Sequence, residues 1–464
     1  MNQIDQEYKA IIIGTGQGGS PLAKELANAG WKTAVIESHH VGGSCINFGC
    51  TPTKTMVASA RVAYLSRRAG DYGVSALEIS VDLKKVKRRK QKIVESFRNS
   101  GRKGLETTEN LDLYFGTGRF LTSQEIEIKF NSREKKVIRG NYIVINTGAE
   151  TLIPGIAGLQ SVNFLTSTSI MELERIPEHL LIMGGGYIGL EFGQMFRRFG
   201  SQVTIVQRGS QLLSREDQDV AEEITNIFRE DGIQVILGAD VTRVEQEDSS
   251  RLTLRIQRNG KSEQVEGTHL LVAVGRRPAT AGLGLDNAGI ERDNGGYIRV
   301  NERLETSLEQ VFAIGDVKGG PAFTHISYDD YRILRDRLLN NRNTTTTGRM
   351  IPYTVFIDPQ LGRVGLSEKE AQQAGYDYKV AKMPMSYVAR ALEVDETRGF
   401  LKVLVDKHTE QILGCAIIGL EGGEMMSMLQ IAMMGNLPYT RLKEGIFAHP
   451  TLAESLNNVF ASWV

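Results

Sequence analysis

The sequence predicts an α/β protein in which one strand–turn–helix–strand module occurs twice and is followed by a smaller α+β unit. Each copy opens with an apolar run, at 10–13 and at 180–183, that leads directly into a Gly-x-Gly-x-x-Gly turn. The spacing to the end of the next apolar run is the same in both copies, from Gly14 to Glu37 and from Gly184 to Gln207. This order of elements is typical of Rossmann-like domains. Beyond residue 346, a strand over 398–405 and a helix over 423–434 predict the third unit.

The connecting segments have their own patterns. Residues 81–107 predict a long helix, and the stretch 126–145 predicts strands. Lysines and arginines are frequent over 84–92, and we expect them to form a solvated helix face. The Asn- and Thr-rich stretch 340–348 predicts a linker.

Length and composition restrict the class of protein. A chain of 464 residues can form roughly two to four domains with ample core. Lys plus Arg and Asp plus Glu both number 55, so the net charge is zero, which disfavours nucleic acids and anionic membranes as partners. The N-terminus lacks the basic-then-apolar layout of a signal peptide, so we expect a cytoplasmic protein. Three cysteines are too few for a disulfide scaffold of this size.

The two glycine turns predict two dinucleotide sites. The glycines permit a tight turn and let the backbone approach a pyrophosphate, which then lies at the positive end of the following helix. One such motif is weak evidence, whereas two in full strand–turn–helix context are strong. The glycines expected to line these sites are Gly14, Gly16 and Gly19 in the first copy and Gly184, Gly186 and Gly189 in the second.

The residue at the end of the second strand of each copy indicates which nucleotide that copy binds. Glu37 in the first copy can accept hydrogen bonds from a ribose 2′-hydroxyl, which FAD and NAD both carry. The second copy has Gln207 and Arg208 there, with Arg215 shortly after. A carboxylate would repel a 2′-phosphate, whereas arginine can bind one. The duplication therefore predicts FAD in the first copy and NADPH in the second, with NADH possible; a surface arginine without a ligand is the alternative reading of Arg208.

Two closely spaced cysteines indicate redox chemistry. Cys45 and Cys50 lie in a Gly-rich segment, and their spacing does not fit zinc, which favours Cys-x-x-Cys. Pro52 stands where a helix could start, so Cys50 is expected at a helix N-terminus. The helix dipole and the cation of Lys54 would stabilise a thiolate there. Such thiolates are suited to two-electron exchange.

Together these motifs make the chain resemble the flavoprotein pyridine nucleotide–disulfide oxidoreductases of class I. The resemblance covers essentially the whole chain and includes Ala313 to Asp316 and His449 to Glu454. Residues 323–332 look most like the mercuric-reductase-like branch, which includes flavoproteins of bacterial reactive-chlorine defence. The resemblance implies two Rossmann-like domains, for FAD and NAD(P), plus a C-terminal α+β dimerisation domain. The implied parts are an FAD domain at 1–150, an NAD(P) domain at 151–275, a central segment completing the FAD domain at 276–345 and an interface domain at 346–464.

The resemblance also implies roles for single residues. Cys50 would be the thiol nearest the flavin and Cys45 the thiol that meets the acceptor. Lys54 would lie near the flavin and pair with Glu191, and Tyr187 would cover the flavin until the nicotinamide arrives. The FAD path would also include Ser44, Gly118, Thr147, Gly148, Asp316 and Thr324, and Val241 and Gly275 would flank the nicotinamide nucleotide.

His449 and Glu454 form the implied acid–base pair. A thiol redox enzyme needs a base that takes the proton from Cys45, and a carboxylate can hold the imidazole in the required tautomer. In the family this pair comes from the partner subunit, so the resemblance implies a homodimer whose active site is shared across the interface.

Several functional readings remain open at this point. The first is an enzyme that passes electrons from NADPH to FAD, to the Cys45–Cys50 disulfide and to a small acceptor, such as Cu(II), Hg(II), a reactive sulfur or chlorine oxidant or a disulfide. Dihydrolipoamide dehydrogenase or a glutathione-reductase-like enzyme is the alternative, and a thiol redox or metal sensor is the non-enzymatic one. Mercuric reductase relatives carry a vicinal cysteine pair near the C-terminus that this sequence lacks, so we expect poor reduction of mercuric ion. Cys415 and the methionines at 425–434 are expected in the core or at the dimer contact.

Overall fold

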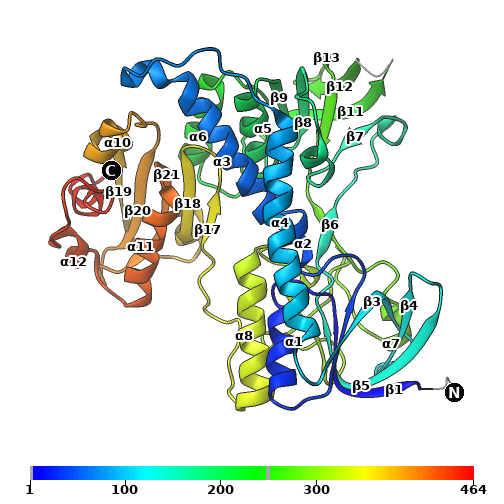
Figure 1. Ribbon diagram of the computed structural model, residues 1–464. Coiled ribbons are helices and arrows are strands. Elements are labelled where there is room, and N and C mark those ends of the chain that lie inside the picture. Colours follow the sequence, from blue (N-terminus) through cyan, green and yellow to red (C-terminus); the bar gives the residue numbers. More distant parts are fainter. Residues whose placement is uncertain (1–3, 247–250) are drawn as a thin grey trace. The chain divides into compact units, whose positions relative to one another are not determined.

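The computed structural model describes residues 4–246 and 251–464 (Figure 1). It separates into two compact units, each made of segments that are distant in the sequence. The first comprises 1–55, 85–152 and 275–349, and the second comprises 56–84, 153–274 and 350–464. The four-part division expected from the sequence remains a prediction. Within the described ranges, no helix is both long enough and apolar enough to cross a membrane.

The first unit contains a parallel sheet in the order β3-β2-β1-β5-β16. The far ends of β3 and β5 continue past this sheet and pair with β4 as an antiparallel meander. Its strands are β1 (Gln6–Ile13), β2 (Thr33–Glu37), β3 (Leu111–Phe120), β4 (Glu125–Phe130), β5 (Lys135–Ile145) and β16 (Val311–Ala313). The unit also contains a separate two-stranded sheet, formed by β6 (Ala149–Thr151) and β15 (Arg276–Pro278).

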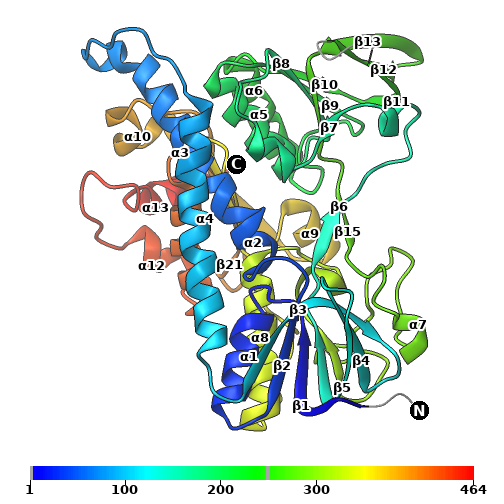
Figure 2. The ribbon, with the colours of Figure 1, turned by 45° about the vertical axis from the view of Figure 1, so that its right-hand side comes forward.

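Both faces of this sheet are buried, as expected for parallel strands. Alternate residues of β1 enter different cores: Ile11 and Ile13 join one cluster, and Ile12 joins the other. On the second face lie α1 (Gly19–Asn28) and α8 (Thr324–Asn340), which run side by side in Figures 1 and 2 and share a core that includes Leu26 and Leu334. The other helices with residues in this unit are α2 (Gly43–Asn47), α4 (Leu83–Glu106) and α7 (Leu285–Ala288), and α3 (Cys50–Arg67) begins in it.

The second unit repeats the same strand plan. Its parallel sheet has the order β10-β9-β8-β14-β7, and an antiparallel meander β11-β12-β13 follows. The elements are β7 (Phe164–Leu165), β8 (His179–Met183), α5 (Tyr187–Phe199), β9 (Gln202–Gln207), α6 (Gln218–Glu230), β10 (Gln234–Leu237), β11 (Ala239–Gln246), β12 (Leu252–Arg258), β13 (Lys261–Gly267) and β14 (His269–Val272). The duplication predicted from the glycine spacing is therefore present in the topology, and the predicted fold class is confirmed.

The C-terminal part of the second unit is an antiparallel sheet covered by short helices. The strand order is β17-β18-β21-β20-β19. Its elements are β17 (Tyr353–Val355), β18 (Gln360–Gly365), α9 (Glu368–Gln373), β19 (Tyr378–Pro384), α10 (Ala389–Glu393), β20 (Phe400–Asp406), β21 (Ile412–Gly419), α11 (Gly422–Met434), α12 (Tyr439–Lys443) and α13 (Ser455–Asn458). Short 3₁₀ turns occur at 69–72, 159–161, 169–172, 315–318, 385–387 and 459–461.

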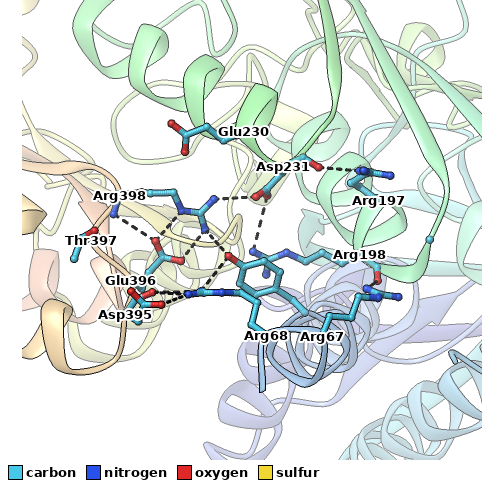
Figure 3. A pocket seen from close by; sticks show the side chains of 12 residues that line it. Arg67, Arg68, Arg197, Arg198, Glu230, Asp231, Asp395, Glu396, Thr397 and Arg398 are labelled. Carbon is cyan, nitrogen blue, oxygen red and sulfur yellow. Dashed lines mark hydrogen bonds and ion pairs between the residues drawn. The ribbon is translucent and has the colours of Figure 1, made fainter. Parts of the chain in front are cut away.

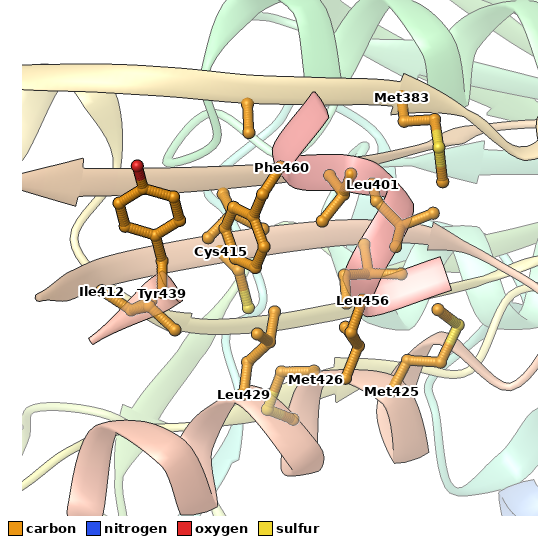
Figure 4. Packing of buried hydrophobic residues seen from close by; sticks show 14 of the residues in the cluster. Met383, Leu401, Ile412, Cys415, Met425, Met426, Leu429, Tyr439, Leu456 and Phe460 are labelled. Carbon is orange, nitrogen blue, oxygen red and sulfur yellow. The ribbon is translucent and has the colours of Figure 1, made fainter. Parts of the chain in front are cut away.

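The core of this sheet contains the third cysteine and part of the methionine group (Figure 4). Cys415 is buried between the sheet and α11, across from Leu429 and Met426, and Met425 belongs to the same cluster further along the helix. On the other side of α11, Ile431 and Met434 are 68% and 66% exposed. Met425 and Met426 are thus core residues, Met428 and Met433 are partly buried against the same core, and Met434 lies on the surface. Cys415 has the environment of a small buried hydrophobe.

A cluster of arginines fills the place where three helices of the second unit end (Figure 3). α3, α5 and α6 end at Arg67, Phe199 and Glu230, around a cavity of about 590 Å³. Helix C-termini carry partial negative charge and unpaired carbonyls. Arg67 donates to the carbonyl of residue 198, and Arg197 donates to the carbonyl of Asp231 at 2.8 Å. Arg67 and Arg197 therefore satisfy helix ends, and Arg398 pairs with Asp231 at 2.8 Å and with Glu396 at 2.7 Å.

A buried lysine fixes the start of α6. Lys402 on β20 is 1% exposed, and its Nζ lies 3.1 Å from Asp217, 2.8 Å from Asp219 and 2.5 Å from Glu368. These three carboxylates are close enough to one another to suggest a cation site. The ammonium of Lys402 lies within reach of all three, and Lys382 Nζ lies 2.6 Å from Asp219, so two lysines offset part of their charge.

Candidate functional site

The first and third glycines occupy equivalent, closely packed positions in the two turns. Gly14 has a φ of +104° and Gly184 a φ of +107°, a region that other residues rarely adopt. A Cβ on either would lie 2.4 Å from a backbone oxygen of the neighbouring strand end. A Cβ on Gly19 or Gly189 would lie 2.4 or 2.2 Å from the oxygen of the first glycine. Each turn is therefore closed tightly by its own backbone.

The middle glycines differ between the copies. A Cβ on Gly16 would meet the side-chain oxygen of Asn146 at 2.5 Å, and this oxygen also accepts a hydrogen bond from Gly19 N at 2.9 Å. Around Gly186, in contrast, there is open space where a Cβ would be. The second turn therefore leaves room at its helix N-terminus for a phosphate to approach.

The carboxylate of Glu37 closes the first turn from the end of β2. One of its oxygens accepts from Thr15 N at 3.1 Å and from the Thr15 hydroxyl at 2.5 Å, and the other accepts from His39 N at 2.8 Å. A carboxylate has about four acceptor positions, so one remains for a ribose hydroxyl. Glu37 is 7% exposed, which keeps this charge out of bulk water.

Gln207 takes the same place in the second turn. Its Oε1 accepts from Gly185 N at 2.9 Å, which matches the bond from Thr15 N to Glu37. Arg208 and Arg215 follow on the surface and form no ion pair or hydrogen bond with the described parts of the chain. Their guanidinium groups are available to a 2′-phosphate.

The two cysteines predicted to carry the redox chemistry lie in the first unit. Cys45 is on α2, Cys50 is the first residue of α3, and the two thiols are hydrogen-bonded to each other. The hydrogen bond to Cys50 raises the pKa of the Cys45 thiol, burial raises it further, and Thr324 and Lys54 act in the opposite direction. The Cys45 thiol therefore keeps its proton at neutral pH. The thiolate that the sequence predicts at Cys50 stays a prediction. Cys50 lies at a helix N-terminus, as predicted.

Several residues predicted to line the FAD path gather in the first unit. The Thr324 hydroxyl, at the start of α8, lies 3.3 Å from Cys50 Sγ. Burial raises the pKa of Asp316, and Arg276 Nη2 lies 3.8 Å from its carboxylate. Two buried polar atoms of this unit, Thr147 Oγ1 and Arg276 Nε, have no hydrogen-bond partner among the described residues. Unpaired buried groups of this kind fit a polar cofactor such as FAD.

The remaining predicted FAD residues also belong to the first unit. Ser44 is exposed on α2, and Gly118 is buried within β3. Gly148 has a φ of +74° with open space around its Cβ position. Lys54 is half-buried on α3, four residues after Cys50. Their contacts with FAD remain predictions.

The predicted partner of Lys54 and one of the two residues predicted to flank the nicotinamide belong to the second unit. Tyr187 is the first residue of α5, and Glu191, one turn later, is buried and accepts from Phe356 N at 2.9 Å. Val241 is buried in β11. Gly275, with a φ of +146°, is exposed in the first unit. The Lys54–Glu191 pair and the positions flanking the nicotinamide stay predictions.

His449 and Glu454 form the pair that the sequence predicted. His449 Nδ1 lies 2.8 Å from one carboxylate oxygen of Glu454 and 3.1 Å from the other. The imidazole is 67% exposed and the carboxylate 29% exposed. When Nδ1 carries the proton and donates to Glu454, Nε2 is left as the basic nitrogen that faces outward.

The sequence reading missed Arg276 and Asn146. Asn146 donates to Ile314 O at 2.9 Å and so joins β5 to the segment before Asp316. The signal for Asn146 was its place directly after β5, where the carboxyl ends of parallel strands meet the nucleotide. Arg276 had no such signal, because its partners lie far away in the sequence.

Comparison with known proteins identifies the family. Residues 8–330 match the pyridine nucleotide-disulphide oxidoreductase family, and residues 351–460 match its dimerisation domain. The chain is 39% identical to the probable pyridine nucleotide-disulfide oxidoreductase RclA of Escherichia coli (strain K12) over 98% of this chain and 99% of that protein. It is 33% identical to a mercuric reductase of Lysinibacillus sphaericus, over 97% of this chain and 82% of that protein.

A solved structure agrees with the sequence comparisons. The Cu(II) complex of the HOCl-induced flavoprotein disulfide reductase RclA from Escherichia coli superposes with a TM-score of 0.90 at 38% identity, covering 99% of both chains. Members of this family use FAD and NAD(P)H. The conserved plan of two nucleotide modules and a dimerisation domain, present here in full, shows that the chain belongs to the pyridine nucleotide-disulfide oxidoreductases, a family of flavin-dependent enzymes.

Proposed function

We propose that this enzyme oxidises NADPH and passes the electron pair through the Cys45–Cys50 disulfide to a small oxidised acceptor. The observation that carries the proposal is the thiol pair itself, hydrogen-bonded at the N-terminus of α3 in the unit that also holds the first glycine turn. In balanced form, NADPH, one proton and the disulfide give NADP⁺ and two thiols. When bound, FAD supplies the redox chemistry that couples hydride transfer from NADPH to reduction of the disulfide.

The protein's own residues control the protons and charges of this step. Lys54 and the N-terminus of α3 favour a thiolate at Cys50 once the disulfide opens. The Thr324 hydroxyl can donate to that sulfur from 3.3 Å. Cys45 keeps its proton because its pKa is raised, first by the bond to Cys50 and then by burial. Cys45 therefore needs a base before it can attack an acceptor.

We assign that base to His449. Glu454 orients the imidazole from 2.8 Å, which leaves Nε2 to take the proton of Cys45 and to return it to the reduced product. The dimerisation domain supports a homodimer. In this proposal each active site combines the thiols of one subunit with the His449–Glu454 pair of the other, so an isolated subunit would lack turnover.

NADPH is the proposed electron donor. Gln207 places an uncharged amide where Glu37 places a carboxylate in the first module, and Arg208 and Arg215 supply positive charge next to it. We place its action in the cytoplasm, because three cysteines cannot form the disulfide scaffold that is typical of secreted proteins.

Copper(II) and reactive chlorine or sulfur oxidants are the acceptors that we propose. The similarity to RclA, described as HOCl-induced and solved as a Cu(II) complex, supports this choice. A dithiol gives up two electrons on closing its disulfide, so it can reduce two Cu(II) ions to Cu(I) or one molecule of a two-electron oxidant. Dihydrolipoamide and glutathione disulfide remain the competing substrates.

Steady-state turnover with a panel of acceptors tests the proposal. The panel contains Cu(II), Hg(II), hypothiocyanous acid, glutathione disulfide and lipoamide, each with NADPH as donor. We expect the highest kcat/KM with Cu(II) or hypothiocyanous acid, and loss of that turnover in Cys45→Ser. Cys415→Ala, a change at a buried core cysteine, is the matched control and should keep it. Higher kcat/KM with lipoamide or glutathione disulfide, or full turnover in Cys45→Ser, would contradict the proposal.

A further inference from the structure

The loop between β9 and α6 is held together by two glutamine side chains. Gln207 Nε2 donates to the carbonyl of Gln211 at 3.3 Å. Gln211 Nε2 in turn donates to the carbonyl of Glu216 at 3.0 Å and to that of Leu213 at 3.5 Å. Gln211 thus connects the residue before Arg208 with the residue after Arg215.

The middle of this loop lies on the second glycine turn. Leu213 N donates to Gly185 O at 2.9 Å, and the Leu212 side chain is fully buried. A Cβ on Gly185 would lie 2.5 Å from Leu212 Cδ2, so the loop contacts the turn directly. The position of the loop is therefore set relative to the site expected for the pyrophosphate.

The far end of the loop is anchored in the C-terminal sheet of the same unit. Glu216 is buried, accepts a hydrogen bond from the Tyr353 hydroxyl and lies 3.4 Å from Arg363 Nε. The next residue, Asp217, pairs with Lys402 at 3.1 Å. The two ends of the loop are therefore fixed independently, and Gln211 spans the distance between them.

The two arginines of the loop contrast with this network. Arg208 and Arg215 are exposed and, within the described chain, take no part in its hydrogen bonds or ion pairs. A loop whose backbone is already ordered loses little entropy when its charged groups bind a ligand. In the first module, by contrast, the residue at the end of the strand accepts from His39 N, two residues later, at 2.8 Å.

We propose that Gln211 is a specificity-determining positioning residue for the coenzyme. Its side-chain amide fixes the separation of Arg208 and Arg215, so that both guanidinium groups can meet one 2′-phosphate. The inference rests on the proposed use of NADPH. It assigns the preference to the geometry of the loop as well as to the two charges that the loop carries.

Calorimetric binding of two nucleotide fragments to the holoenzyme tests this assignment. The fragments are adenosine 2′,5′-bisphosphate and 5′-AMP, which differ at the 2′-phosphate. In Gln211→Met, which keeps the side-chain length and removes the donor, we expect the Kd of the bisphosphate to rise about fivefold. The Kd of 5′-AMP should stay within about twofold, because its contacts lie elsewhere. In turnover, the KM for NADPH should rise while kcat and both constants for NADH stay unchanged.

Gln218→Met is the matched control. Gln218 is an exposed amide on α6 that bonds to Glu222 at 2.6 Å, and its removal should leave both Kd values as they are. FAD content and the thermal unfolding midpoint, measured on the same samples, confirm that each variant is folded. Arg215→Ala shows how much the Kd of the bisphosphate rises when one cation is lost.

The possible results distinguish failure of the Gln211 inference from failure of the NADPH proposal. If the wild type prefers the bisphosphate and Gln211→Met keeps that preference, the inference fails and NADPH stands. Equal weakening of both fragments in Gln211→Met would also overturn it, because the effect would then be general. If the wild type binds both fragments equally, the NADPH proposal fails and the inference fails with it.

Discussion

Replacing Gln207 by glutamate together with Arg208 by alanine should reverse the coenzyme preference from NADPH to NADH. The first module shows that a carboxylate fits this position, because Glu37 accepts from Thr15 N at 3.1 Å as Gln207 accepts from Gly185 N at 2.9 Å. A glutamate at 207 keeps that acceptor. It loses the donation to the carbonyl of Gln211, and its charge repels a 2′-phosphate.

The size of this effect follows from the contacts removed. One charge-assisted hydrogen bond contributes about 1.5–3 kcal/mol, which corresponds to a factor of roughly 10 to 100 in kcat/KM for NADPH. The new carboxylate adds repulsion to this loss, so we expect the NADPH-to-NADH ratio to fall by roughly 100-fold or more. The assay is steady-state kinetics with both coenzymes on wild type and the double variant. FAD content, which depends on the separate first module, should not change. An unchanged ratio in the double variant would refute the reasoning, as would a wild type that uses NADH as well as NADPH.

Three further changes test other parts of the site and the fold. Thr324→Val removes a hydroxyl that lowers the pKa of Cys45. The pH dependence of thiol alkylation should therefore shift to higher pH, and the alkylation rate at pH 7 should fall by roughly threefold to tenfold. An unchanged pH profile would count against this role. Glu454→Gln keeps the shape of the acid–base pair but removes the carboxylate charge. Turnover should fall about 10- to 100-fold, while the rate of flavin reduction by NADPH, measured by rapid mixing, should stay normal. Slower flavin reduction would point to a different role. Lys402→Met removes the ammonium that contacts all three carboxylates, while Lys382 still pairs with Asp219 at 2.6 Å, and should lower the free energy of unfolding by about 3 kcal/mol at pH 7 in urea titrations. Although burial opposes the shift, the hydrogen bonds from Lys382 and Lys402 hold the pKa of Asp219 below its usual range. This stabilisation is therefore lost only as the pH falls through and below that range, where the difference between variant and wild type should shrink; a difference that stays constant at low pH would contradict the assignment.

Local sequence patterns predicted the repeated module and its turns. The steric demands on Gly14 and Gly184 come from the adjoining strand ends, and such close backbone packing forces a glycine that is visible in the sequence. The same holds for Cys50, whose place at the start of α3 followed from Pro52. His449 and Glu454 are five residues apart, so their pairing could also be anticipated from one short segment.

Contacts between distant segments could not be predicted in this way. Arg276 meets Asp316 across 40 positions, and Glu216 meets Tyr353 across more than a hundred. Neither pair has a spacing rule, because the topology of the unit alone brings the partners together. The raised pKa of Cys45 could not be predicted from the sequence either, because it depends on the orientation of the Cys45 side chain toward Cys50 and on its burial.

The central claim is that Cys45 and Cys50 carry the electron pair away from the flavin, and a thiol count tests it most directly. The oxidised holoenzyme is mixed anaerobically with one equivalent of NADPH per chain, denatured, and titrated with a thiol reagent. The chain has three cysteines, so the account predicts one thiol before reduction, from Cys415, and three afterwards. A count that stays at one after NADPH is consumed would show that the electrons do not reach the cysteine pair, and would contradict the account.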